Sequence, residues 1–319
     1  MKRRAFIRNT AGFAGLLSLF PAGLSGITRE QKPGLLEKRS LGRTGLKLSI
    51  LGFGGIVVRD ATPDQAAERV KNAIDRGINF FDVAPSYGNA EEILGPALQP
   101  YRKDVVLACK TRERDKENSR RELEQSLTYL KTDYFDLYQF HVVQTIEQVE
   151  QIFGPGGAME TMLEAKEEGL IKHIGFSAHS VEAALLLMER FDFDTVMFPF
   201  SASSWHAGNF GPQVMQRAHE KQMGILALKS MVKGPWPAGT TERPPKLWYE
   251  PMFDPEEALT GLRFALSHPI TLALPPGNED LFKMATEIMT EFTPLSPDEV
   301  DKIKREASQQ APLFKYPMS

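Results

Sequence analysis

Residues 48–82 read LSILGFGGIVVRDATPDQAAERVKNAIDRGINFFD and contain one complete strand–helix–strand unit. The short apolar runs at 48–51 and 78–81 predict strands. Between them, Thr62–Gln65 predicts the start of a helix: the threonine caps it, the proline takes the first helical position and the glutamine reaches back to the cap. Strands joined through a helix run parallel. The stretch therefore indicates a parallel sheet covered by helices.

The same unit recurs along the chain. Further strands are predicted, in order, at 105–108, 135–140, 173–176, 195–198, 224–228 and 270–274. The helices after them are predicted to begin at or near Ser119, Thr145, Ser180, Pro212, Asp254 and Leu281, with one more at Ser296. Eight units predict a closed (β/α)₈ TIM barrel, a single α/β domain over residues 37–310 with a C-terminal tail at 311–319. The alternative is an open doubly wound sheet, but Val57 replaces the third glycine of its Gly-x-Gly-x-x-Gly turn.

The composition excludes several classes of function. The chain has 38 basic and 41 acidic residues, a formal net charge of −3, and 42% hydrophobic residues. A nearly neutral globular protein has no electrostatic reason to bind nucleic acid or an anionic membrane surface. Cys109 is the single cysteine, which excludes an intramolecular disulfide, a closed cysteine zinc site and an iron–sulfur cluster. The chain also lacks His-Glu-x-x-His, so no metal site is predicted.

The first 26 residues are predicted to be an export signal. An Arg3-Arg4-x-Phe6-Ile7 pattern precedes an uncharged apolar stretch at 11–24, which is too short for stable membrane insertion. The pattern resembles the twin-arginine type, which carries folded proteins across the membrane. It predicts a periplasmic protein with the twin-arginine export machinery as a partner. The alternative is a cytoplasmic protein with a basic N-terminus.

Four polar residues follow predicted strands. Asp82 ends the second strand and Tyr87 follows it, Lys110 ends the third, and His141 ends the fourth. In a barrel of this type the active site forms at the carboxyl ends of the strands. We therefore expect the four side chains to surround one barrel mouth.

These residue types suit proton transfer to a carbonyl oxygen. A tyrosine has an ordinary pKa of about 10, and a nearby ammonium group is expected to lower it. Asp82 would keep Lys110 charged, while His141 would hydrogen-bond a carbonyl and orient it toward Tyr87. None of these side chains can donate a hydride, so a nicotinamide cofactor is predicted.

The segment Phe81-Asp82-Val-Ala-Pro-Ser-Tyr87-Gly88-Asn-Ala-Glu91 resembles the Asp-x-Ala-x-x-Tyr-Gly segment of the aldo-keto reductases. Four other segments are similar to that family: Leu41–Leu46 to its N-terminal hairpin, 108–111 and 138–141 to its lysine and histidine segments, and 175–177 to its fifth strand. The resemblance covers about residues 37 to 290. It implies a (β/α)₈ oxidoreductase that uses NADP or NAD on a small carbonyl or alcohol substrate, with a tetrad of Asp82, Tyr87, Lys110 and His141.

On the cofactor side, the resemblance implies contacts from Gly55, Ser177, Phe200, Lys229, Gly277 and Asn278. Phe200 is expected to stack on the nicotinamide. The chain departs from the family at Ala178 and Met197, where asparagine and glutamine are usual. Glu279 and Asp280 follow the eighth strand, with Lys283 as the only nearby cation, and would repel a 2′-phosphate. NADH is therefore expected to bind at least as well as NADPH.

Aromatic residues on predicted site loops are candidate substrate contacts, with packing as the other interpretation; they are Trp205, His206, Trp236 and Trp248. The long segment 234–251 is a candidate lid. Because free nicotinamide cofactors are scarce outside the cytoplasm, an exported enzyme is expected to retain its cofactor. The bound cofactor would then be recharged in place by a ping-pong hydride exchange, in which one substrate is oxidised and another is reduced at the same site. Sugars or polyols are the guess for both substrates. Two other functions remain open: a Schiff-base aldolase that uses Lys110, and a non-catalytic cofactor-binding module.

Overall fold

The computed structural model describes residues 35–317. The predicted export signal lies outside these residues. Within 35–317, no helix has both the length and the apolar character needed to cross a membrane.

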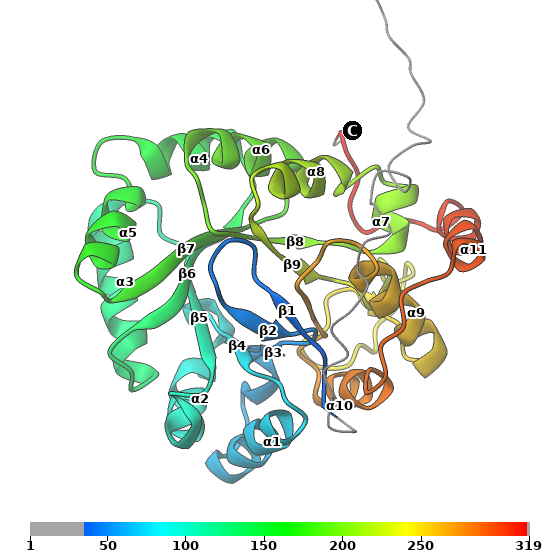
Figure 1. Ribbon diagram of the computed structural model, residues 1–319, viewed down its shortest axis with the longest axis horizontal. Helices are drawn as coiled ribbons and strands as arrows, with labels where there is room; N and C mark the ends of the chain where they lie inside the picture. The colour runs from blue at the N-terminus through cyan, green and yellow to red at the C-terminus, as the bar shows by residue number, and fades with distance from the viewer. Residues whose placement is uncertain (1–34, 318–319) are drawn as a thin grey trace, which may run out of the picture. The chain divides into compact units, whose positions relative to one another are not determined.

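Eight parallel strands form the central sheet (Figure 1). They are β3 (Phe53–Gly54), β4 (Phe80–Asp82), β5 (Val106–Thr111), β6 (Phe135–Val143), β7 (Ile171–Ala178), β8 (Thr195–Pro199), β9 (Gly224–Leu228) and β12 (Leu272–Leu274). Backbone bonds close the ring, because Gly52 donates to Ala273 and Ala273 donates to Ile50. The predicted (β/α)₈ barrel is confirmed.

Helices surround the strands (Figure 1). They are α1 (Pro63–Asp75), α2 (Ala90–Leu98), α3 (Lys116–Tyr129), α4 (Ile146–Phe153), α5 (Ala158–Glu167), α6 (Val181–Arg190), α7 (Ala202–His206), α8 (Pro212–Glu220), α9 (Pro255–Leu266), α10 (Glu279–Ile288) and α11 (Pro297–Ala307). Short 3₁₀ turns are η1 (Gly55–Val58), η2 (Pro85–Tyr87) and η3 (Gln99–Tyr101). The predicted capping box at Thr62 is confirmed: its hydroxyl accepts from the Gln65 amide, and the Gln65 side chain accepts from the Thr62 amide.

Two predicted boundaries are wrong. Leu48 and Ser49 belong to the hairpin strand β2 (Lys47–Ser49), which pairs with β1 (Lys38–Ser40), and the first barrel strand begins only at Phe53. The apolar run at 48–51 continues across this boundary because its first residues are also buried, where the hairpin covers the amino-terminal end of the barrel. Helix α3 begins at Lys116 rather than Ser119, because Asp115 caps it one turn earlier.

The barrel interior is apolar at one end and polar at the other. Side chains from six strands form an inner cluster with Leu41 and Leu48 of the hairpin; they are Phe80, Val106, Ala108, Leu137, Met197, Leu226, Leu272 and Leu274. The hairpin therefore closes the amino-terminal end of the barrel. Because side chains alternate along a strand, the inward positions toward the carboxyl ends hold polar residues, and these form the candidate site.

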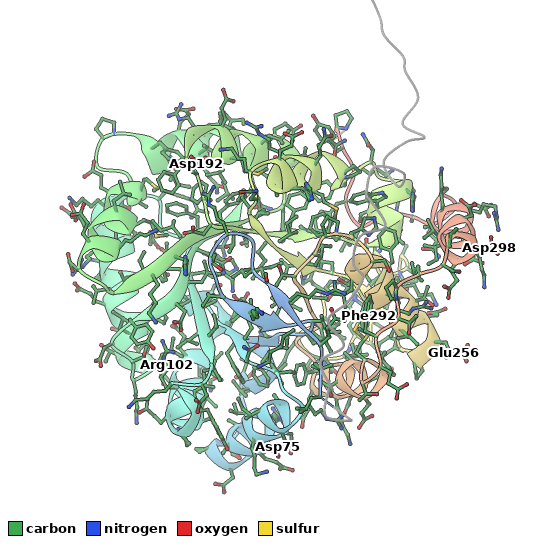
Figure 2. All side chains as sticks on the ribbon, in the orientation of Figure 1. Asp75, Arg102, Asp192, Glu256, Phe292 and Asp298 are labelled. Carbon is green, nitrogen blue, oxygen red and sulfur yellow. The ribbon has the colours of Figure 1, made fainter. Side chains whose placement is uncertain are left out.

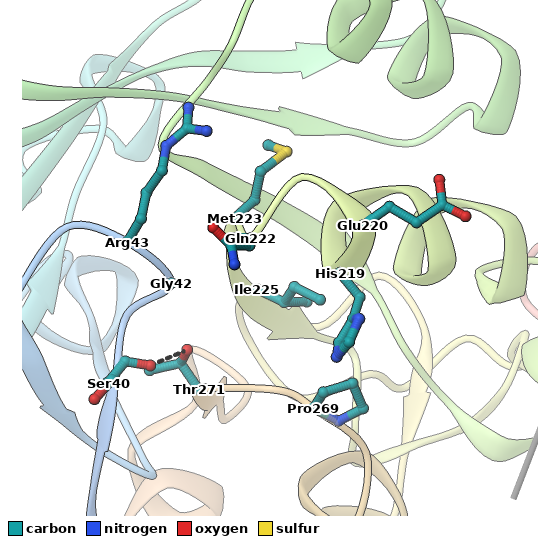
Figure 3. A pocket seen from close by; sticks show the side chains of 10 residues that line it. All are labelled: Ser40, Gly42, Arg43, His219, Glu220, Gln222, Met223, Ile225, Pro269 and Thr271. Atoms are coloured by element: carbon teal, nitrogen blue, oxygen red, sulfur yellow. Dashed lines mark hydrogen bonds between the residues drawn. The ribbon is translucent and has the colours of Figure 1, made fainter. Parts of the chain in front are cut away.

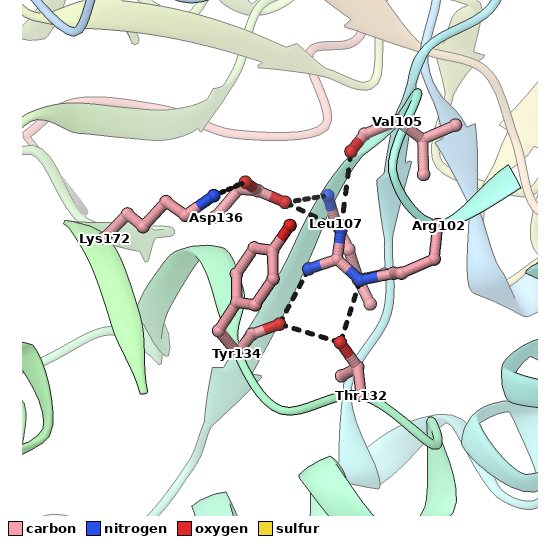
Figure 4. Close-up of polar contacts among 7 residues, drawn as sticks. All are labelled: Arg102, Val105, Leu107, Thr132, Tyr134, Asp136 and Lys172. Carbon is pink, nitrogen blue, oxygen red and sulfur yellow. Dashed lines mark hydrogen bonds and ion pairs between the residues drawn. The ribbon is translucent and has the colours of Figure 1, made fainter. Parts of the chain in front are cut away.

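A buried ion pair joins the beginnings of strands β5 and β6. The Asp136 carboxylate accepts from Arg102 at 3.0 Å, from the Leu107 amide at 3.0 Å and from Lys172 at 2.9 Å (Figure 4). The Arg102 guanidinium lies 4.2 Å from the centre of the Tyr134 ring. Other acids lie exposed at the surface, on helices for Asp75, Glu256 and Asp298 and on the loop after α6 for Asp192 (Figure 2). Asp136 therefore has a structural role, away from the barrel mouth.

A long connection follows β9. Its ends pair as β10 (Val232–Gly234) and β11 (Glu250–Pro251), and near its far end Lys246 donates to the carbonyl of Val57 in η1 at 3.3 Å. The C-terminal segment folds back toward α7, where Phe314 stacks on Phe210 at 5.0 Å and the Tyr316 amide donates to Gly208. Both segments lie on the carboxyl-end side of the strands.

A surface cleft of about 660 Å³ lies at the opposite end (Figure 3). It separates the hairpin residue Arg43 from His219 and Glu220 of α8. The Arg43 guanidinium donates to the backbone carbonyls of Asp192, Phe193 and Lys221. These bonds fasten the hairpin to the barrel.

Candidate active site

Three strands position the polar centre. Asp82 is paired in register with Ala108, and Lys110 two residues later is paired with Gln139. The three polar side chains therefore enter the barrel at neighbouring positions near its carboxyl end. Gln139 donates to Asp82 Oδ1 at 3.4 Å. Gly175 lies beside Gln139 in the next strand, and a Cβ there would collide with Thr195.

The Lys110 ammonium lies between the other groups. Lys110 Nζ donates to Asp82 Oδ2 at 2.5 Å, to the Val83 carbonyl at 3.2 Å and to the Tyr87 hydroxyl at 3.2 Å. Lys110 is fully buried and Asp82 is 2% exposed. Burial is the largest single influence on the pKa of Lys110 and lowers it, but the charges of Asp82 and Tyr87 and the hydrogen bonds to them together raise that pKa above its ordinary value. Lys110 is therefore a stable ammonium.

Tyr87 ends the 3₁₀ turn η2, directly after β4. The half-buried side chain lies with its hydroxyl against the buried Lys110 ammonium. Burial raises the pKa of Tyr87 above its usual value, and the positive charge of Lys110 offsets this only in part. The predicted net lowering of the tyrosine pKa is wrong, because desolvation of the phenolate outweighs the ammonium.

His141 completes the predicted group. Its ring lies 5.5 Å from the Tyr87 ring in an edge-to-face arrangement, and its Nδ1 shares a 3.3 Å hydrogen bond with the Ser86 hydroxyl. Burial lowers the pKa of His141 well below its usual value, assisted by the charges of Lys110, Arg112 and other cationic neighbours. The imidazole is therefore neutral at pH 7. The structure brings all four predicted residues together.

Sequence reasoning missed three groups around them. Gln139 supports Asp82, Ser86 contacts His141, and Arg114 donates to the His141 carbonyl at 2.7 Å. Gln139 was detectable, because it lies two residues before His141 on the same strand and so shares its inward face. Ser86 lies in the short 3₁₀ turn η2 and Arg114 on the loop after β5, where no periodicity indicates the direction of a side chain.

Four of the predicted cofactor residues lie around the barrel mouth, and each already makes a hydrogen bond or a close packing contact within the protein. The Ser177 hydroxyl accepts from the Val142 amide at 2.8 Å. Asn278 caps α10 by accepting from the Leu281 amide. A Cβ at Gly55 would crowd Val83, and one at Gly277 would collide with Ile56. The two glycines therefore permit close packing of the turns after the first and last strands.

Three of the residues predicted as aromatic contacts pack against other rings in the structure. Phe200 is 1% exposed, and its ring contacts Phe198 and Trp205, so no face is open to a nicotinamide. Trp205 and His206 pack against Phe264 of α9. The physical reason is local: the loop after β8 forms the short helix α7, which directs these side chains toward α9.

The other two tryptophans lie on the long connection after β9. Trp236 packs against Phe253. Trp248 is 54% exposed, and its ring centre lies 5.1 Å from the ammonium of Lys229, with Tyr249 on the same group at 4.6 Å. Trp248 stays a candidate substrate contact, whereas Trp236 packs against Phe253, in line with the packing interpretation.

Lys229 directly follows β9 and has a φ of 66°. Its ammonium makes no hydrogen bond or ion pair to any residue within 35–317. Burial lowers the pKa of Lys229 to about 8. Burial and the charge of Lys229 together lower the pKa of His179 to about 4, and the Nε2 atom of His179 is buried without a hydrogen-bond partner. A cation without a counter-charge beside an unpaired donor or acceptor is suited to an anionic ligand.

The acidic turn after β12 has basic residues close to it. Glu279 forms an ion pair with Arg69 of α1. Arg59, Arg69 and Lys246 are three cations in this region, with Asp60 as a further acid. Burial and the charges of Arg69 and Arg59 lower the pKa of Lys246. The prediction that Lys283 is the only nearby cation is wrong, because barrel closure brings α1 against α10. The charge argument against a 2′-phosphate therefore no longer holds.

Comparisons with known proteins agree with this architecture. A family profile described as "Aldo/keto reductase family" matches residues 50–237, more than half of the chain. An uncharacterized oxidoreductase, YqkF, from Bacillus subtilis is 29% identical over 62% of this chain and 66% of its own length. The L-galactose dehydrogenase of Arabidopsis thaliana is 32% identical over 49% of this chain and 52% of its own length.

The matched region spans about half to two thirds of these curated relatives. Among solved structures, an aldo-keto reductase from Klebsiella pneumoniae in complex with NADPH superposes with a TM-score of 0.68 at 20% identity, covering 89% of this chain and all of that one. At this identity the superposition shows the shared fold. With the profile match and the barrel, it leads to one conclusion: the chain belongs to the aldo/keto reductase family.

Proposed function

We propose that this protein is an NAD(P)-dependent oxidoreductase that interconverts a carbonyl compound and an alcohol, with Tyr87 as general acid or base. The observation that carries the proposal is the Lys110 ammonium, which is 2.5 Å from Asp82 and 3.2 Å from the Tyr87 hydroxyl. A buried ammonium in this position can stabilise negative charge on the tyrosine oxygen as its proton leaves.

Each residue has a defined part in the proposed reduction. Tyr87 donates its proton to the carbonyl oxygen. Lys110 stabilises the phenolate that forms, and Asp82 keeps the ammonium charged and fixed. Neutral His141 holds the carbonyl oxygen by a hydrogen bond, since its pKa lies well below 7. The nicotinamide cofactor, when bound, supplies the hydride that reduces the carbonyl carbon.

The residues at the mouth fit an anionic dinucleotide. Lys229 has no counter-charge among residues 35–317, and Ser177 keeps its hydroxyl proton free after accepting from Val142. The Klebsiella pneumoniae reductase that shares this fold was solved in complex with NADPH. We therefore assign the pyrophosphate contact to Lys229. NADP and NAD both remain compatible with the charges near Glu279, and Gly55, Gly277 and Asn278 would shape the adjoining turns.

Replacing Lys229 should weaken cofactor binding. Loss of a charge-assisted hydrogen bond typically costs about 1.5–3 kcal/mol, so Lys229→Met should raise the Kd for NADPH and NADH about 10- to 100-fold. Fluorescence titration measures both constants. The matched control is Lys233→Met, because Lys233 lies on the same segment but pairs with Glu257 at 3.2 Å. Equal affinities for the two variants would show that Lys229 does not hold the cofactor.

The activity itself is tested by following NAD(P)H oxidation across a panel of aldehydes, ketones and sugars. Turnover supports the oxidoreductase. Cofactor binding without turnover on any substrate would favour a non-catalytic binding module. The aldolase alternative needs a neutral nucleophilic Lys110, whereas Asp82 raises the pKa of that lysine. A substrate–lysine adduct trapped by borohydride would nevertheless establish the aldolase.

We further propose that residues 1–26 direct the folded protein to the periplasm by the twin-arginine route, with cofactor already bound. The segment 234–251 supports retention, because Lys246 fastens it to η1 while Trp248 and Tyr249 cover Lys229. One substrate would then be oxidised and a second reduced at the same site. The L-galactose dehydrogenase among the relatives makes sugars the first substrates to try.

Protein purified from the periplasm should therefore release near-stoichiometric NAD(P) when it is denatured. At an association rate near 10⁶ M⁻¹s⁻¹, a nanomolar Kd corresponds to release in about a thousand seconds, so retention requires still tighter binding or the closed segment. Parallel-line kinetics with two substrates would accompany retention. Protein without cofactor that works only with added NAD(P)H, or that stays in the cytoplasm, would contradict this proposal and leave the oxidoreductase unaffected.

A further inference from the structure

The backbone directly after His141 adopts an unusual conformation. Val142 has a φ of 53°, which lies in the left-handed region that β-branched residues rarely enter. Such a conformation costs about 1–3 kcal/mol and persists only where the surroundings hold it. The structure must therefore contain groups that maintain it.

This residue creates a bulge in the barrel wall. Strands β6 and β7 pair Phe140 with Phe176 and then Val143 with Ala178. His141 and Val142 together therefore oppose the single residue Ser177. Bulges of this kind change the direction of side chains and are frequent beside active sites.

Two side chains hold the peptide group between His141 and Val142. Its carbonyl accepts from Arg114 Nη2 at 2.7 Å, and its N–H donates to Ser177 Oγ at 2.8 Å. Ser177 is 1% exposed. Arg114 is itself fixed by the carbonyls of Thr111 and Glu113, each at 3.3 Å. Rotating this peptide would leave a buried donor and a buried acceptor without partners, which is costly.

We propose that Ser177 and Arg114 are positioning residues for His141, which fix the plane of the 141–142 peptide and so set the direction in which the imidazole enters the site. The inference rests on the proposed function, because it takes His141 to orient the carbonyl substrate. It gives the oxygen of Ser177 a role in placing His141, whereas the resemblance to the family implied a cofactor contact alone. The serine proton remains available to the cofactor.

Removing either side chain should impair substrate handling. Ser177→Ala and Arg114→Met should each raise the KM for the carbonyl substrate or lower kcat, about 10- to 100-fold in kcat/KM, since small misplacements of a catalytic group have effects of this size. The Kd for NAD(P)H should stay unchanged in Arg114→Met, whereas in Ser177→Ala it should rise only by the loss of the contact that the serine proton makes with the cofactor. Arg112→Met is the matched control for charge, because Arg112 is exposed on the same loop and makes no side-chain bond to this peptide in the described structure.

A second substitution tests the mechanism of the loss. Glycine adopts a φ of 53° without strain, so Val142→Gly introduced into Ser177→Ala should recover most of the lost kcat/KM. A serine needed only for general stability would not be rescued in this way. Urea unfolding of each variant shows whether stability changes independently of activity.

A readout without turnover separates this inference from the proposed function. In protein labelled with ¹⁵N-histidine, the imidazole signals of His141, identified with His141→Gln, should shift in Ser177→Ala and return in the Val142→Gly double variant. If wild-type protein reduces no carbonyl, the proposed function fails and this result still decides the positioning.

Unchanged His141 signals in Ser177→Ala, or an effect confined to NAD(P)H affinity, would overturn the proposal and leave Ser177 as a cofactor contact only. Should Ser177→Ala fail to fold, the same signals in Arg114→Met decide the question.

Discussion

Tyr87→Phe should bind NAD(P)H as tightly as the wild-type protein and lose about 10²–10⁴-fold in kcat, the usual contribution of a general acid. The substitution removes one oxygen, 3.2 Å from Lys110 Nζ, and leaves the ring in its edge-to-face contact with His141. Steady-state kinetics with fluorescence titration of the cofactor measures both quantities. The control is Tyr129→Phe, because Tyr129 is 38% exposed on the outer helix α3. Near-normal turnover in Tyr87→Phe would refute the assignment.

The pH dependence follows from the direction of the tyrosine shift. Reduction needs Tyr87 protonated, and burial raises its pKa above the usual value of about 10. The kcat/KM for reduction should therefore show no loss through ionisation of Tyr87 until the pH exceeds about 10. Alcohol oxidation needs the opposite form, so its rate should rise with pH over the same range. A fall in reduction assigned to this tyrosine between pH 7 and 8 would show that Lys110 controls its pKa after all.

The central group was predictable because its placement follows from strand geometry. Asp82, Lys110 and His141 lie at strand ends, and parallel strands in a barrel bring those ends to one mouth. Alternation along the strand also explains why Cys109, next to Lys110, points to the helix layer, where its thiol contacts Glu91 of α2. Local periodicity is enough to derive such positions.

The errors arise where tertiary contacts decide. Phe200 and Trp205 follow β8 as loop residues would, but Trp205 packs against Phe264 of α9 and Phe200 packs against Trp205, and no local pattern reveals that packing. The ion pair between Arg69 and Glu279 joins residues far apart in the sequence. That pairing was within reach, since a closed barrel places its first and last helices side by side. The desolvation that raises the tyrosine pKa depends on burial, which the sequence does not quantify.

Lys110→Met should remove activity and destabilise the fold together. The substitution leaves the Asp82 carboxylate, 2% exposed, without its partner at 2.5 Å. Breaking a buried pair from one side costs about 3–5 kcal/mol, measured here as the loss in the free energy of unfolding in urea. Turnover should fall by at least about 10²-fold, because no cation then stabilises the developing phenolate of Tyr87.

A second substitution separates these two effects. In Lys110→Met/Asp82→Asn neither member of the pair is charged, and the asparagine oxygen can still accept from Gln139, which donates to Asp82 Oδ1 in the wild type. Because removing both charges of a buried pair is often close to neutral, most of the unfolding free energy should return. Turnover should not return, since the ammonium is still missing. Recovery of both quantities would mean that Lys110 serves only to compensate Asp82, and the proton-transfer role assigned to this lysine would then be wrong.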